Sequence, residues 1–218
     1  MEITGKKINF LGDSITEGHG CSSEAARFTN LIADKTGALC RNYGIGGTRV
    51  ARQATVSANP VWDQDFCARA LTMDPDADLI VVFGGTNDFG HGDAPLGEMS
   101  DRTVDTFYGA LHTLYTSLIT RYPEAPIVIL TPLHRTNEDN LKGDGYKACD
   151  VADLKKYVNI IREVAEYYSL PVLDLYATSG LQPKVPVIFD KYVPDGLHPN
   201  DAGHVILTDK ILSFLKTL

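Results

Sequence analysis

Short apolar runs alternate with longer amphipathic stretches along the whole chain. The short runs are rich in β-branched residues and lie at Lys7–Leu11, Leu39–Tyr43, Leu79–Phe83, Ile127–Leu130 and Pro171–Asp174. Runs of this length and composition predict β-strands. Leu79–Phe83 is apolar at every position, which is typical of a central strand that is covered on both faces.

Between these runs, apolar residues recur at steps of three and four positions, as they do on one face of an α-helix. One such set, before Pro123, comprises Val104, Phe107, Leu111, Leu114 and Leu118. Another, before Pro171, comprises Val151, Leu154, Val158, Ile161, Ala165 and Tyr168. Because proline disrupts a helix, each set predicts a helix that ends ahead of the proline.

Two further helices are expected nearer the ends of the chain. Ala25, Phe28 and Ile32 mark the first, with Gly37 at its expected end. Asn200 can cap the second, which carries Ile206 through Leu215. Strands that alternate with helices imply right-handed crossovers and a mostly parallel sheet, so the fold class is α/β, a three-layer α/β/α sandwich.

The chain shows no repeat, no low-complexity tract and no composition shift that would mark a linker. Its 218 residues fit one domain, expected to span residues 1–218. In open α/β sheets the ligand crevice lies beyond the carboxyl ends of the strands. Candidate chemistry is therefore sought at those ends.

Composition and charge narrow the function classes. The formal net charge is −8 without any run of Lys or Arg, which argues against a nucleic-acid surface. No stretch of about 18 apolar residues occurs, so no membrane span is expected. The N-terminus shows no signal-peptide pattern, and the scattered cysteines Cys21, Cys40, Cys67 and Cys149 favour free, buried thiols. A cytoplasmic location is the resulting expectation.

A serine follows the first predicted strand, in the segment Gly12-Asp13-Ser14. A residue at this place lies at the crevice, but a serine there can also serve simply as a helix cap. The G-x-S-x-G elbow of other hydrolases is absent around Ser14. Ser14 must therefore be judged by the residues that accompany it.

Glycines and an asparagine follow the second and third predicted strands. Gly44, Gly46 and Gly47 let a backbone approach a ligand and turn its N–H groups toward an oxyanion, although tight turns also use glycine. Their spacing matches neither a Rossmann nor a P-loop fingerprint. In Gly85-Thr86-Asn87-Asp88, the Asn87 amide can donate to a developing negative charge, or the pair can form an Asx-turn.

A stiff segment near the C-terminus, Pro194-Asp195-Gly196-Leu197-His198-Pro199, holds an aspartate three residues before a histidine. Asp195 can accept a hydrogen bond from His198 Nδ1, which leaves Nε2 to take a proton from a serine. A local hydrogen bond without catalysis is the other interpretation. Each signal is modest by itself, but four of them occur in order, each at a strand end or rim loop.

These blocks resemble those of the GDSL, or SGNH, hydrolase family, and they span almost the whole chain: Gly12-Asp13-Ser14, Gly47, Gly85-Thr86-Asn87-Asp88 and Asp195-Gly196-Leu197-His198. The resemblance implies a flavodoxin-like α/β/α fold with a five-stranded parallel sheet. It also implies ester hydrolysis without metal or organic cofactor. By that likeness Ser14 is the nucleophile, His198 the base and Asp195 its orienting partner. The oxyanion hole would comprise the Ser14 and Gly47 N–H groups and the Asn87 side chain.

The substrate suggested by the sequence is a small-molecule ester with a short acyl group, most naturally an acetyl group on a carbohydrate or other small alcohol. The chain lacks a long apolar lid segment, which disfavours bulk lipid. The polar, acidic segment 137–144 is expected to form a mobile rim. The candidate pocket residues, each of which can equally be a surface loop residue, are Trp62, Phe89, His91, His134 and Arg135.

Other functions compete with this hypothesis. A lipase or thioesterase of the same family is the nearest alternative. A dinuclear metallophosphoesterase would need several His and Asp ligands at strand ends, and the first strand end offers no Asp-x-His pair. A non-catalytic binding module on the same fold would typically have lost one member of the Ser-His-Asp set. The sequence does not determine the oligomeric state.

Overall fold

The computed structural model describes residues 2–218 as one α/β/α sandwich around a five-stranded sheet. All neighbouring strands are parallel, in the order β2-β1-β3-β4-β5. This flavodoxin-like order confirms the predicted fold class. The strands are β1 (Lys7–Gly12), β2 (Leu39–Gly44), β3 (Leu79–Phe83), β4 (Ile127–Leu130) and β5 (Val172–Leu173).

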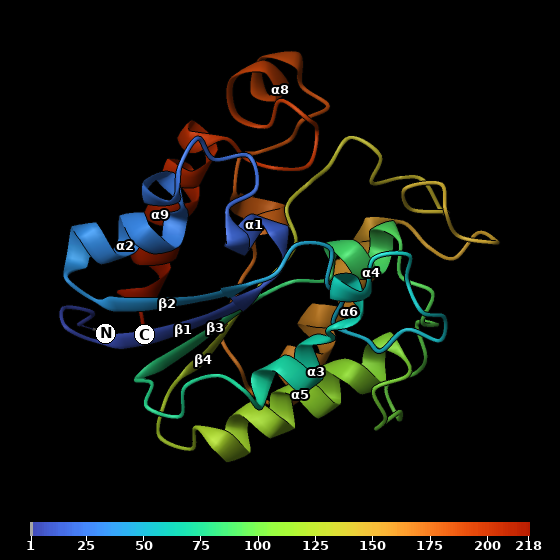
Figure 1. Cartoon of the computed structure of the whole chain (residues 1–218), viewed down its shortest axis with the longest axis horizontal. Helices are drawn as coiled ribbons and strands as arrows, with labels where there is room; N and C mark the ends of the chain where they lie inside the picture. Colours follow the sequence, from blue (N-terminus) through green and yellow to red (C-terminus); the bar gives the residue numbers. More distant parts are fainter. Residues whose placement is uncertain (1) are drawn as a thin grey trace.

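The central strand β3 explains how the two faces of the sheet are covered. Leu79, Val81 and Phe83 pack into a core with α2 (Phe28–Thr36) and α9 (Asp201–Leu215). Ile80 and Val82 point to the other core, with residues of α3 (Phe66–Ala70), α5 (Phe107–Arg121) and α6 (Leu154–Tyr167). Figure 1 shows the two groups of helices on opposite faces of the sheet. A strand that is apolar throughout therefore fits because both faces are buried.

The long helices lie close to where the apolar spacing predicts them. Gly37 ends α2 with a left-handed φ of 72°, and the Asn200 side chain caps α9 by accepting from Gly203 N–H at 3.1 Å. The short helices were not predicted, because an element of one turn has too few residues to show a period. They are α1 (Ser14–Glu17), α3, α4 (Thr86–Gly90), α7 (Leu175–Thr178), α8 (Pro186–Tyr192) and the 3₁₀ turns η1 (Glu24–Ala26) and η2 (Pro60–Asp63).

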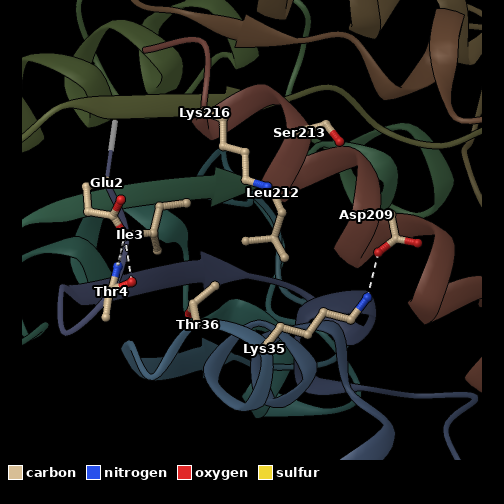
Figure 2. Close-up of a pocket in the computed structure, with 9 residues that line it drawn as sticks. All are labelled: Glu2, Ile3, Thr4, Lys35, Thr36, Asp209, Leu212, Ser213 and Lys216. Atoms are coloured by element: carbon tan, nitrogen blue, oxygen red, sulfur yellow. Dashed lines mark hydrogen bonds and ion pairs between the residues drawn. The ribbon is translucent and has the colours of Figure 1, made fainter.

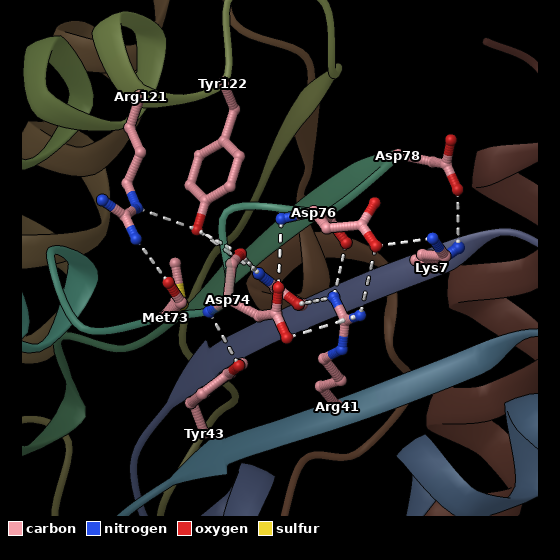
Figure 3. Close-up of polar contacts among 10 residues, drawn as sticks. Lys7, Arg41, Tyr43, Met73, Asp74, Asp76, Asp78, Arg121 and Tyr122 are labelled. Carbon is pink, nitrogen blue, oxygen red and sulfur yellow. Dashed lines mark hydrogen bonds and ion pairs between the residues drawn. The ribbon is translucent and has the colours of Figure 1, made fainter.

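At the amino ends of the strands a polar network fixes the loop that enters β3 (Figure 3). Asp74 lies at its centre: its N–H donates to Tyr43 Oη at 2.9 Å, and its carbonyl accepts from Tyr122 Oη at 2.8 Å. Arg41 donates to the Asp76 carbonyl at 2.6 Å, and the Lys7 N–H donates to the Asp78 carboxylate at 2.8 Å. The charged side chains named here are bound to one another or to backbone groups. We therefore assign this end of the sheet a structural role.

A hollow of about 600 Å³ lies between the chain start, α2 and α9 (Figure 2). Its charged groups are paired, with Lys35 Nζ 2.7 Å from Asp209 Oδ1 and Thr4 Oγ1 2.6 Å from Glu2 Oε1. It holds no hydrogen-bonded serine–histidine pair among the described residues. Within residues 2–218, no helix has the length and apolar character that spanning a bilayer requires.

Candidate active site

A cleft of about 800 Å³ opens at the carboxyl ends of β1, β2 and β3. The strand order reverses between β1 and β3, which is where α/β sheets bind their ligands. Ser14 follows β1, Gly46 and Gly47 follow β2, and Asn87 follows β3. The lining residues are Ser14, Glu17, His19, Ile45, Gly46, Gly47, Arg49, Ser57, Ala58, Val61, Trp62, Asn87, His91, Asp144, Tyr146, Leu197 and His198.

Ser14 is the first residue of α1, directly after its N-cap Asp13. The Asp13 carboxylate accepts from Ile15 N–H at 3.0 Å, so the aspartate of the Gly-Asp-Ser block shapes the turn rather than facing the cleft. Within residues 2–218 the Ser14 N–H donates to no acceptor. Ser14 therefore offers both a hydroxyl and an unused amide to the cleft.

The segment after α8 builds a compact turn around Asp195. One carboxylate oxygen accepts from Leu197 N–H at 2.9 Å and from His198 N–H at 2.7 Å. The other lies 2.7 Å from His198 Nδ1. Gly196, at a φ of 80°, gives this turn a conformation that other residues rarely adopt. The imidazole is thus held by its own loop.

Ser14 Oγ lies 2.9 Å from His198 Nε2, although the two residues are 184 positions apart. A carboxylate only accepts hydrogen bonds, so Nδ1 carries the proton and Nε2 presents its lone pair to the Ser14 hydroxyl. Burial acts to raise the pKa of Asp195, but the hydrogen bonds from His198 and Leu197 hold that pKa well below its usual range. Asp195 is therefore a stable anion, and the three side chains form one hydrogen-bonded chain.

Two further hydrogen-bond donors converge near Ser14. The Gly47 N–H has no acceptor within residues 2–218, whereas the neighbouring Gly46 N–H donates to Glu17 Oε2 at 2.8 Å. Asn87 Nδ2 donates one hydrogen to the Thr48 carbonyl at 3.0 Å, which leaves its second hydrogen for the cleft. The geometry favours Gly47 over Gly46 as the glycine with a free donor.

Trp62 and His91 lie over this glycine. Gly47 has a φ of 75°, and a Cβ built on it would lie 2.2 Å from Trp62 Cδ1, so no larger residue fits there. His91 Nε2 donates to the Gly47 carbonyl at 3.1 Å, and its ring packs on Trp62 with centroids 5.0 Å apart. The two sequence-predicted pocket residues that line the cleft thus also fix the glycine turn.

The other three predicted pocket residues do not line the cleft. Phe89, a residue of α4, is fully buried in the core. Arg135 is buried too, where it packs on Phe89 and pairs with Asp144. The His134 ring lies against Tyr176 and pairs with Glu138, with Nδ1 2.6 Å from Oε2. Their positions after strands predicted side chains at the crevice. Instead, Phe89 is buried by apolar packing, and Arg135 and His134 pair with carboxylates without lining the cleft themselves.

The segment 137–144, expected as a mobile rim, is held against α4. Asp144 N–H donates to the Gly90 carbonyl at 2.7 Å, and Gly143 packs so closely that a Cβ there would lie 2.2 Å from the same carbonyl. Just beyond it, Lys147 Nζ donates to the Asp88 carbonyl at 2.8 Å. This wall of the cleft is therefore ordered by its contacts and brings Asp144 to the lining.

Sequence reasoning missed two buried charges that support the site. The Asp88 carboxylate accepts from Val50 and Ala51 N–H groups, each at 2.9 Å, and so ties α4 to the segment after the glycine turn. Arg69 donates to the Gly12 carbonyl at 3.0 Å and to Thr48 Oγ1 at 2.8 Å. A charged residue in a short apolar stretch such as Phe66–Ala70 was the available signal for Arg69.

The Asp13 carboxylate is buried, and its burial in the charged form lowers the stability of the folded protein. Its second oxygen has no hydrogen-bond partner, and burial raises the pKa of Asp13 to about 6. The folded state thus binds a proton more tightly than the unfolded chain, whose Asp pKa is 3.8. Stability from this group is present at acidic pH and is lost as the pH rises from about 4 through 6.

We expect Asp13→Asn to remove this pH dependence, because asparagine stays neutral and can still accept from Ile15 N–H. From pH 4 to pH 7 the free energy of unfolding of the variant, relative to that of the wild type, should rise by about 2 kcal/mol, since part of the difference between the two pKa values already acts at pH 4. Urea unfolding of both proteins at the two pH values measures the gap. A gap that does not change with pH contradicts the expectation.

The four cysteines are all free thiols, as expected, although only Cys67 is buried and Cys149 is exposed. The pKa of the Cys67 thiol is raised, first by burial and then by the nearby carboxylates of Asp65 and Asp88. None of the four lines the cleft, whose lining includes the hydroxyls of Ser14 and Ser57, and of these two Ser14 Oγ is the one hydrogen-bonded to an imidazole.

Comparison with known proteins agrees with this geometry. The model of the GDSL-like lipase/acylhydrolase family matches residues 10–206. A GDSL lipase of Mycobacterium tuberculosis is 28% identical over 217 residues, which cover 94% of this chain and 79% of the relative. The crystal structure of a Lactobacillus plantarum protein is 30% identical with a TM-score of 0.84, over 99% of this chain and 98% of that one.

A more distant solved structure is a two-domain esterase active on acetylated mannans, co-crystallised with mannopentaose. It is 22% identical with a TM-score of 0.64, over 97% of this chain and 49% of that one. At this identity the likeness concerns the fold.

Proposed function

The chain belongs to the GDSL-like lipase/acylhydrolase family, and on that premise we propose that it is a serine esterase with Ser14 as nucleophile, His198 as base and Asp195 as the orienting carboxylate. The observation that carries the proposal is the unbroken chain of hydrogen bonds from Ser14 Oγ through His198 to Asp195. A nucleophile hydrogen-bonded to a base, itself oriented by a third group, is the arrangement of covalent acyl transfer.

In the proposed reaction, His198 Nε2 takes the Ser14 proton while Oγ bonds to the ester carbonyl carbon. The carbonyl electrons move to its oxygen, giving a tetrahedral oxyanion. Collapse restores the carbonyl and expels the alcohol oxygen, which takes the proton from His198. Water then repeats the sequence on the acyl-serine, releasing the acid and regenerating Ser14. Asp195 stays ionised throughout and stabilises the imidazolium.

The oxyanion would be held by the Ser14 N–H, the Gly47 N–H and the Asn87 side chain. The two amides have no other acceptor within residues 2–218, and Asn87 keeps one Nδ2 hydrogen for the cleft. Donors fixed before the reaction stabilise the transition state without reorganisation. Here the fixing comes from α1, from the Trp62–His91 cover and from the Thr48 carbonyl.

We expect Asn87→Ala to lower kcat by roughly 10²–10³, the usual effect of losing one oxyanion donor. KM should change little, because the donor acts on charge that appears only in the transition state. Steady-state kinetics with an activated ester measures both values. If KM alone rises, Asn87 positions the substrate instead.

The cleft supports a small, polar ester as substrate. Among the polar groups of its lining are the carboxylates of Glu17 and Asp144 and the side chains of His19 and His91, against which a long acyl chain would lie unfavourably. The partly exposed Trp62 and the exposed Tyr146 also line the cleft and offer aromatic faces. Aromatic faces with carboxylates beside them suit a sugar ring, whose C–H faces stack while its hydroxyls donate hydrogen bonds.

We therefore propose that the enzyme removes short acyl groups, chiefly acetyl, from a carbohydrate or a similar small alcohol. The two-domain esterase active on acetylated mannans, about half of which shares this fold, supports the proposal. One observation favours a second candidate, an acylhydrolase for longer chains: Ile45, Val61 and Leu197 add apolar surface to the same cleft.

The acyl-length preference separates these two candidates. We expect p-nitrophenyl acetate and propionate to be hydrolysed with a higher kcat/KM than the octanoate, and acetylated sugars to release acetate. Each methylene that fits an apolar pocket adds about 1 kcal/mol or more, so a long-chain enzyme would show a steep opposite trend. Rates that rise from acetyl to octanoyl reject the short-acyl proposal and support the second candidate.

A further inference from the structure

A second histidine lies against the proposed base. His19 follows α1, and its ring packs on the ring of His198 with the centroids 4.3 Å apart. One ligand atom from each of His19, Asp195 and His198 can be chosen so that all three lie within 4.8 Å of one another. His19 and Asp195 are exposed, so an ion from solvent can reach the group.

The backbone segments that carry His19 and His198 are in contact with each other. Gly20 packs so closely on the His198 loop that a Cβ there would lie 2.5 Å from the Pro199 carbonyl. The Ser22 N–H and hydroxyl donate to the Asp201 carboxylate at 2.8 and 2.6 Å. The loop that carries His19 is thus bound to the loop that carries His198. Coordination of one ion would require the side chains to rotate so that their ligand atoms, now within 4.8 Å of one another, face a common point.

Two imidazoles and a carboxylate are a ligand set of Zn²⁺. Sites with three protein ligands leave the fourth tetrahedral position to water, with metal–ligand distances of about 2.0–2.2 Å. Hard ions such as Mg²⁺ and Ca²⁺ prefer oxygen ligands alone, which this group does not offer. The chemistry therefore selects a Zn²⁺-like ion.

We propose that His19, Asp195 and His198 form a binding site for Zn²⁺ whose occupation inhibits the hydrolase. The inhibitory part rests on the proposed function, because it requires His198 to be the base. Bound at Nε2, the ion takes the lone pair that would accept the Ser14 proton. Bound at Nδ1, it replaces the proton given to Asp195, so Nε2 carries a hydrogen and cannot act as base. Either mode of binding stops catalysis.

The first test measures binding without activity. Isothermal titration of the Ser14→Ala variant with ZnCl₂ should show one ion per chain, because the three ligands remain. The same variant carrying His19→Ala should bind at least about tenfold more weakly, since losing even an outer partner of a metal site typically has that effect. Co²⁺ should give the intense visible absorption of a tetrahedral site in the first protein only. Equal Zn²⁺ affinity in the two proteins overturns the proposal.

The second test measures inhibition, each protein being compared with its own metal-free rate. Zn²⁺ should inhibit the wild type reversibly, with recovery on addition of EDTA, whereas Mg²⁺ and Ca²⁺ at equal concentration should not. In His19→Ala the inhibiting concentration should rise at least about tenfold. The matched control is His134→Ala, which breaks another histidine–carboxylate pair outside the cleft and should leave the inhibiting concentration unchanged.

The two tests fail in distinguishable ways. If Ser14→Ala still hydrolyses esters, the proposed function is wrong while the binding measurement still decides the metal site. If His19→Ala and His134→Ala shift the inhibiting concentration equally, or neither shifts it, the metal acts elsewhere and the site is refuted.

Discussion

Ser14→Ala should reduce kcat by roughly 10⁵–10⁶, the scale seen when a serine hydrolase loses its nucleophile. The variant keeps the amides at positions 14 and 47 and the Asn87 side chain, so it should still bind substrate and retain the small acceleration that oxyanion stabilisation gives. The measurement is hydrolysis of p-nitrophenyl acetate, with circular dichroism and thermal unfolding to verify the fold.

Labelling supplies the control for this variant. A fluorophosphonate probe should label the wild type and leave Ser14→Ala unlabelled. Ser57 lines the same cleft, but its hydroxyl lies 2.6 Å from Asp63 Oδ1 and, within residues 2–218, is hydrogen-bonded to no imidazole. Ser57→Ala should therefore be labelled as the wild type is. A folded Ser14→Ala protein with undiminished hydrolysis contradicts the assignment of the nucleophile.

Asp195→Asn should lower kcat by roughly 10⁴, an effect known for the carboxylate of such a triad. The two N–H groups of Leu197 and His198 hold one side-chain oxygen, so an asparagine must place its oxygen there and turn its NH₂ toward His198 Nδ1. That NH₂ donates, which forces Nδ1 to accept and puts the ring proton on Nε2. His198 then faces Ser14 with a hydrogen instead of a lone pair.

The loss should appear in kcat, while KM and the midpoint of urea unfolding stay close to those of the wild type, because the turn keeps its backbone hydrogen bonds. The matched control is Asp209→Asn, which removes a surface carboxylate of α9 that pairs with Lys35 of α2. This variant should behave as the wild type. An Asp195→Asn enzyme within tenfold of wild-type kcat would show that His198 finds its tautomer without the carboxylate.

How far the sequence predicts this site depends on how local each signal is. Asp195 and His198 lie in one short turn, and Ser14 and Asn87 directly follow strands whose apolar pattern is unmistakable. Their positions at the crevice follow from the rule for parallel sheets. The pairing of Ser14 with His198 is confirmed as a 2.9 Å contact.

The rule for parallel sheets does not predict which way a side chain points after a strand ends. Arg135 follows β4 as Ser14 follows β1, yet it is buried under Asp144 because a loop with no periodic pattern folds over it. Asp88 stands next to Asn87, yet its carboxylate is buried and accepts from the Val50 and Ala51 amides, and it does not line the cleft. Such choices depend on where distant loops pass, which single-sequence patterns do not encode.

The 184 positions between Ser14 and His198 have a consequence for how the chain is made. Strand β1 and α1 leave the ribosome before the other four strands, whereas the turn that carries the proposed base is synthesised only after all five strands. A nascent chain that has folded its sheet still lacks a proton acceptor for its serine, so it cannot attack esters in its surroundings. On the proposed function, hydrolysis begins only when the contact between Ser14 and His198 closes, which makes turnover itself a reporter of that contact.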